Sequence, residues 1–105
     1  MQLAVIMTSA GLVEEWNPLA QELFGYSSEY ARGQSLGELI VPEPMRPYHE
    51  MGLRRYVQTR DPHCIGSVME VEALHQEGHP VPIHLQILPR DTDGALFFEA
   101  HMAAR

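Results

Sequence analysis

Hydrophobic and polar residues alternate along two stretches in the second half of the chain, which predicts two β-strands. In residues 64–74, CIGSVMEVEAL, one face collects Ile65, Ser67, Met69, Val71 and Ala73. In residues 81–88, VPIHLQIL, one face collects Val81, Ile83, Leu85 and Ile87. The link HQEGH contains a turn glycine, so the two strands form a predicted hairpin with its turn at residues 76–78. That register joins the two inward faces, with Ala73 opposite Val81, Val71 opposite Ile83 and Met69 opposite Leu85.

The ends of the chain carry the remaining strand patterns. Residues 3–16, LAVIMTSAGLVEEW, read as two strands joined by the turn signal TSAG. Residues 95–103, ALFFEAHMA, form the last predicted strand.

Helical patterns lie between these two groups of strands. In residues 17–25, Asn17 is a suitable N-cap, Pro18 suits the first helical position and Gly25 is a suitable stop. Two shorter helical turns follow, in SSEYARG and SLGELIV.

A fourth helix is predicted towards residue 56, within the stretch VPEPMRPYHEMGLRRY. Pro44 and Pro47 fit only near its start, because proline lacks the N–H that a helix interior requires. Steps of three and four place one set of residues on an inward face: Met45, His49, Gly52, Leu53 and Tyr56. His49 is therefore expected to point inward, and Gly52 would leave an open notch beside its imidazole.

Strands and helices are segregated along the chain, which indicates an α+β fold with an antiparallel five-stranded sheet and short helices on one face. The 105 residues suffice for a single domain, predicted to span residues 1–105. His49 from the helical layer and Met69 from the sheet would then face the space between the layers.

The net charge and the cysteine content limit the classes of partner and the compartment that we expect. Fourteen acidic and seven basic residues give a net charge of −7, so we expect neither nucleic acid nor a membrane surface as a partner. The single cysteine, Cys64, has no internal disulfide partner, which is typical of a reducing compartment. With no basic leader and no long apolar run, the chain is predicted to be cytoplasmic.

Three phrases resemble the PAS domain family over nearly the whole chain: NPLAQELFGYSSEYARGQSL, LIVPEPMRPYHEMGLRRY and GHPVPIHLQI. The first and third are typical of PAS domains in general. The second is similar to the haem-binding PAS domains of rhizobial oxygen-sensor kinases and haem-regulated phosphodiesterases. The resemblance implies a PAS fold, haem b as cofactor and His49 as the proximal iron ligand. It also places in or beside the distal pocket Ile65, Ser67, Met69, Leu85 and Ile87.

Met69 is the candidate sixth ligand, although it does not occupy the position of the family's methionine. The kinase-type sensors have an arginine at this position, and the phosphodiesterase type has a methionine where this chain has Ser67. Residues two apart on a strand share a face, so Met69 has the geometry for the role. We expect Gly52, Leu53 and Tyr56 to line the cofactor from the helix, and Arg54 or Arg55 to lie on a solvated face within reach of a propionate.

Each candidate also has a structural interpretation. His49 would be a half-buried imidazole hydrogen-bonded to backbone, and Met69 would fill the core. Cys64 would be an inert thiol or a minor pocket residue. His75 and His79 flank the hairpin turn, but without a cysteine or carboxylate cluster to complete a metal site we interpret them as solvated loop residues.

The predicted function is sensory. We expect a haem-binding PAS domain that responds to a diatomic gas (O2, CO or NO) or to redox state, and that forms a homodimer by analogy with the family. The alternative is a PAS interaction or dimerisation module whose pocket is empty or holds a flavin or another small molecule. No phosphate loop or nucleophile–base pair is visible, so we do not predict an enzyme. The sequence does not name the effector domain or partner protein.

Overall fold

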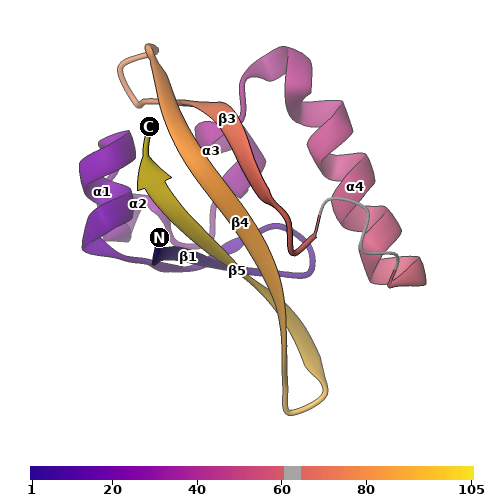
Figure 1. Cartoon of the computed structure of the whole chain (residues 1–105). Coiled ribbons are helices and arrows are strands. Elements are labelled where there is room, and N and C mark those ends of the chain that lie inside the picture. Colours follow the sequence, from indigo (N-terminus) through magenta and orange to yellow (C-terminus); the bar gives the residue numbers. More distant parts are fainter. Residues whose placement is uncertain (61–64) are drawn as a thin grey trace.

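A five-stranded antiparallel sheet and a run of short helices make up the computed structural model, which describes residues 1–60 and 65–105 (Figure 1). The elements, in chain order, are β1 (Gln2–Thr8), β2 (Val13–Trp16), α1 (Pro18–Phe24), α2 (Ser28–Ala31), α3 (Leu36–Ile40), the 3₁₀ helix η1 (Glu43–Met45), α4 (Arg46–Thr59), β3 (Val68–Leu74), β4 (Pro80–Thr92) and β5 (Ala95–Ala104). The strand order is β2-β1-β5-β4-β3, which confirms the predicted α+β architecture. Among the described residues, no helix has the length and apolar character needed to cross a bilayer. Cys64 lies outside the described residues.

The β3–β4 hairpin has the predicted register. Val71 pairs with Ile83 and Met69 with Leu85, so the apolar faces of the two strands coincide. β3 lies at the edge of the sheet and pairs only with β4.

β4 is longer than the sequence pattern predicted. It continues through Pro89 to Thr92 and returns through a tight turn at Asp93 and Gly94, whose φ angles are 50° and 79°. An Asp-Gly pair with two positive φ angles suits a two-residue hairpin, and this signal was missed because Pro89 interrupts the apolar run. Pro89 is tolerated because it lies beyond the part of β4 that pairs with β3.

Helix α1 begins and ends as predicted, but the Asn17 side chain makes a different contact from the predicted N-cap. Asn17 occupies the N-cap position without a side-chain cap, and its Nδ2 instead donates to the Leu3 carbonyl at 2.9 Å. This bond attaches the start of α1 to β1. Gly25 ends the helix in the left-handed region with φ 89°.

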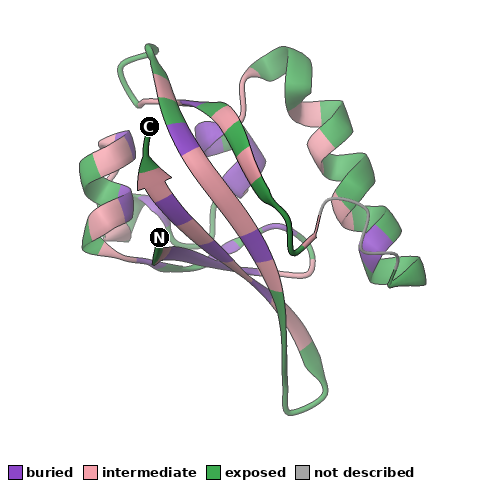
Figure 2. Cartoon of the chain, viewed as in Figure 1, coloured by how far each residue is buried: buried purple, intermediate pink, exposed green. Residues whose placement is uncertain are grey.

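Helix α4 buries a narrower face than the one predicted. His49 and Leu53 are half-buried and Tyr56 is buried, but Met45 and Gly52 are exposed (Figure 2). The prediction that these two lie on the inward face is wrong. Met45 belongs to η1, before the α-helical turns start at Arg46, and Gly52 falls on the flank of the stripe.

Contacts at both ends hold α4 in place. At its start, the Arg46 guanidinium donates to the carbonyls of Val41 and Glu38, at 3.0 and 3.2 Å. Near its end, the Tyr56 ring meets Phe98 of β5 edge-on, with centroids 5.5 Å apart. Phe98 is fully buried, so this aromatic pair joins α4 to the main core.

Replacing Gly25 with alanine is predicted to destabilise the fold by more than the same change at Gly33. Both residues have positive φ, 89° and 84°, so each substitution costs about 1–2 kcal/mol of backbone strain. Only at Gly25 would the added Cβ also meet a side chain, 2.7 Å from Cε1 of His75, whereas at Gly33 nothing lies within 4 Å. Urea unfolding of both variants measures the difference, and equal losses would contradict the role given to the Gly25–His75 contact.

Candidate functional site

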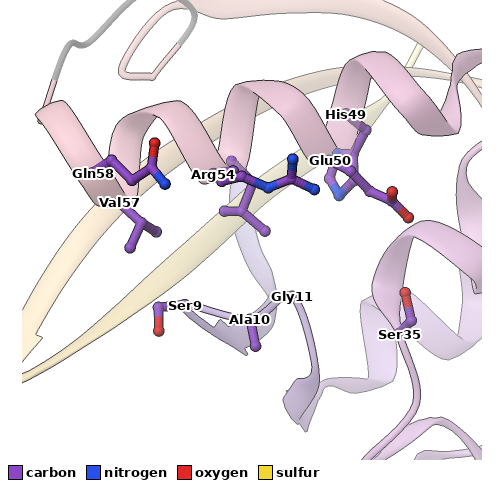
Figure 3. A pocket seen from close by; sticks show the side chains of 10 residues that line it. Ser9, Ala10, Gly11, Ser35, His49, Glu50, Arg54, Val57 and Gln58 are labelled. Carbon is purple, nitrogen blue, oxygen red and sulfur yellow. The ribbon is translucent and has the colours of Figure 1, made fainter.

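An open groove of about 370 Å³ runs between α4 and the turn that joins β1 to β2 (Figure 3). The turn contributes residues 9–11, and Ser35 at the start of α3 lines one end. The α4 side chains that line it are His49, Glu50, Leu53, Arg54, Val57 and Gln58. The groove therefore has a polar rim, with one imidazole and one aliphatic residue on the half-buried face of the helix.

His49 reaches the groove because α3 has a glycine where the two helices meet. A Cβ built on Gly37 would lie 3.2 Å from Cδ2 of the imidazole and 3.7 Å from Nε2. Most side chains at position 37 would displace the ring. Gly11 has the same relation to Leu53, with its built Cβ 3.2 Å from Cδ2. Two glycines thus allow the half-buried face of α4 to approach its neighbours.

The imidazole of His49 is held in its neutral form. Burial lowers the pKa of His49 because the charged form loses solvation, and this outweighs the nearby Glu50 carboxylate, which raises it. Within the described residues the ring has no hydrogen-bonding partner, so the backbone-bonded interpretation of His49 is not supported. A neutral imidazole without a partner keeps a lone pair available to a ligand or metal.

The predicted strand residues lie outside this groove. Met69 and Leu85 are half-buried and Ile87 is buried, but none of them is among the lining residues. The same holds for Ile65, which is half-buried, and for Ser67, which is exposed and precedes β3. The groove brings together His49 and Leu53 of α4. The predicted distal residues lie away from it, on the β3–β4 hairpin or just before β3.

Tyr56 and Gly52 are also absent from the groove lining. Tyr56 turns towards Phe98, and Gly52 is exposed with nothing within 4 Å of a built Cβ. The sequence predicted the β1–β2 turn, but neither this turn nor Gly37 was expected to belong to the site. The signals were available in TSAG and SLGELI, but a turn motif does not reveal which distant helix it will face.

The hairpin turn is exposed at residues 76–79, in agreement with its interpretation as solvated loop. Glu77, inside the turn, brings a carboxylate to His75 and His79, and one ligand atom from each of the three lies within 4.8 Å of the others. The prediction that no carboxylate completes this group is wrong. Glu77 was overlooked because the H-x-E-x-H spacing converges only when the turn closes.

Comparison with known proteins places these features in a family. A PAS fold family model matches residues 2–98. Sensor protein FixL from Bradyrhizobium diazoefficiens is 32% identical over 94 residues, 90% of this chain and 18% of that protein. An uncharacterised protein from Azorhizobium caulinodans is 29% identical over 96 residues, 91% of this chain and 13% of its own length. The chain thus spans less than a fifth of these curated relatives.

Solved structures agree at the level of the fold. A PAS domain from Desulfitobacterium hafniense superposes with a TM-score of 0.78 at 13% identity, covering 99% of this chain and 92% of that one. The PAS domain of the Cronobacter turicensis quorum-sensing receptor RpfR, in complex with BDSF, gives a TM-score of 0.69 at 15% identity, covering 97% and 91%. The family match and the fold establish that this chain belongs to the PAS family of sensory domains in signal transduction.

Proposed function

We propose that this chain is a haem-binding sensory domain that responds to a diatomic gas or to redox state, with His49 as the residue that would bind the haem iron. One observation carries the proposal: the histidine implied by the resemblance is a neutral, half-buried imidazole that has no hydrogen-bonding partner among residues 1–60 and 65–105. The 32% identity to the FixL sensor protein supports it. When bound, haem would supply an iron atom at which a small gas can bind.

The residues around His49 suit a planar group that is apolar except for two carboxylates. Leu53 presents an aliphatic surface one turn further along α4, on the same half-buried face. Arg54 lines the groove and offers a guanidinium, the group that binds carboxylates best. Gly37 leaves the room in which the imidazole lies.

Met69 is proposed as a second residue that would bind the haem iron. It is half-buried on β3, on the face that also carries Val71 and the buried Ala73. A thioether is a soft ligand that favours ferrous iron and is readily replaced. Because β3 pairs with β4 alone, release of Met69 would loosen one edge of the sheet and change the surface offered to an effector. We likewise propose that the cofactor contacts Ile65, Ser67, Leu85 and Ile87, and Tyr56 of α4.

The second candidate is a PAS interaction module that binds another small molecule, such as a flavin, or none. The groove itself favours this alternative, because its lining includes none of the predicted distal residues. In either case a homodimer and a cytoplasmic location are proposed.

The first test is the absorption spectrum of purified protein titrated with hemin. The wild type is expected to show the Soret band of a histidine-ligated haem, and His49→Ala to lose it. His84→Ala is the matched control, since His84 is also half-buried but lies on β4. A band that survives in His49→Ala would refute the ligand assignment, and loss in both variants would point to a different histidine or to misfolding.

Replacement of Met69 by alanine tests the second axial ligand. The reduced wild type is expected to give a six-coordinate spectrum, and Met69→Ala a five-coordinate one with tighter CO binding, because CO no longer competes with sulfur. Leu85→Ala is a control for lost packing, because Leu85 pairs directly with Met69 across the hairpin. An unchanged six-coordinate spectrum in Met69→Ala would exclude this residue.

The pH dependence of stability tests the state of His49 without any cofactor. Its folded pKa lies below the ordinary value of about 6.5, so the unfolded chain binds more protons in that interval. The stabilisation is complete above pH ~6.5 and is lost as the pH falls towards the folded pKa, at up to about 1.4 kcal/mol per pH unit. Urea unfolding of His49→Gln should lack this part of the slope, and identical slopes would contradict the lowered pKa.

A further inference from the structure

The β3–β4 turn gathers two imidazoles and one carboxylate at the tip of the hairpin. The rings of His75 and His79 stack with centroids 4.3 Å apart and planes 15° apart. Oε1 of Glu77 lies 3.7 Å from Nδ1 of His75. His75 is half-buried, whereas Glu77 and His79 are exposed, so a solvated ion can reach the group.

The backbone of the turn holds these three residues in place. The N–H of His75 donates to the His79 carbonyl at 2.9 Å, and the N–H of Gly78 donates to the His75 carbonyl at 2.8 Å. The N–H of Gln76 donates to the Phe24 carbonyl at 2.8 Å, which attaches the turn to the end of α1. Only side-chain rotation is then needed to draw the ligand atoms together.

Hydrogen bonds also orient the lone pairs of both rings. Nδ1 of His75 accepts from the N–H of Glu77 at 3.0 Å, so this nitrogen is unprotonated and faces the turn. Nδ1 of His79 lies 3.3 Å from the Pro80 carbonyl. A proton on that Nδ1, donated to the carbonyl, leaves Nε2 of His79 with a free lone pair, the arrangement that commonly orients metal-bound histidine.

We propose that His75, Glu77 and His79 form a binding site for a divalent transition-metal ion of the zinc class. Two imidazole nitrogens and a carboxylate oxygen suit Zn²⁺, with water as a fourth ligand. Zinc–nitrogen bonds of about 2.1 Å require ligand atoms roughly 3.4 Å apart. The ligand atoms now lie within 4.8 Å of one another, so these distances must shorten and the two rings must unstack when the ion binds. The ion replaces the N–H of Glu77 as the partner of Nδ1 in His75.

Such an ion would stiffen the hairpin where it abuts α1. A Cβ built on Gly25 lies 2.7 Å from Cε1 of His75, so the ring already rests on the end of that helix. Metal binding would therefore stabilise the contact between the β3–β4 hairpin and the end of α1. The site lies apart from the groove, since none of its three residues lines it, and it does not depend on haem.

Calorimetric titration of untagged, cofactor-free protein with ZnCl₂ tests the site. One equivalent should bind to the wild type, and both His79→Ala and Glu77→Gln should weaken binding by at least about tenfold, the loss seen even for outer-shell partners. His101→Ala is the matched control, because His101 faces the Glu99 carboxylate at 3.0 Å but, among the described residues, belongs to no three-ligand group.

A second readout uses the melting temperature, which should rise with ZnCl₂ concentration in the wild type and in His101→Ala, whereas Glu77→Gln should need at least about tenfold more ZnCl₂ for the same rise. Wild-type affinity in His79→Ala, or an equal loss in His101→Ala, would overturn the proposal. The hemin titration separates this site from the haem proposal, since His79→Ala should leave the Soret band unchanged.

Discussion

The close approach of α4 to α3 at Gly37 is the constraint on which the site depends. No side chain separates the two helices there, so the imidazole of His49 lies against the glycine instead of extending into solvent. The resulting burial lowers its pKa and keeps it neutral. The Arg46 bonds to α3 and the Tyr56–Phe98 contact hold the helix in this position.

The hairpin could be predicted from sequence because its determinants are local. Alternation along β3 and β4 and a glycine in the turn define a register that admits one pairing of the apolar faces, and Met69 does lie opposite Leu85. The helix boundaries at Pro18 and Gly25 followed for the same reason. The continuation of β4 past Pro89 could not be predicted in this way, because a proline is tolerated there only if β3 does not pair with that part of β4.

The site was harder to predict because it depends on contacts between distant segments. Helical spacing placed His49 and Leu53 inward correctly, but the same spacing included Met45, which lies in η1 before α4 starts, and Gly52, and both are exposed. No periodicity could indicate that the β1–β2 turn would form the opposite wall of the groove. The convergence of Glu77 with two histidines likewise required the closed turn.

The most direct test of the account is an NMR titration of the histidine ring signals with and without hemin. The account predicts that His49 titrates below the ordinary histidine pKa of about 6.5 in the free protein, because burial disfavours its charged form, and that its ring signals stop responding to pH when hemin is added. If the pKa of His49 is at or above the ordinary value, or if its ring continues to titrate with hemin bound, the central claim is contradicted.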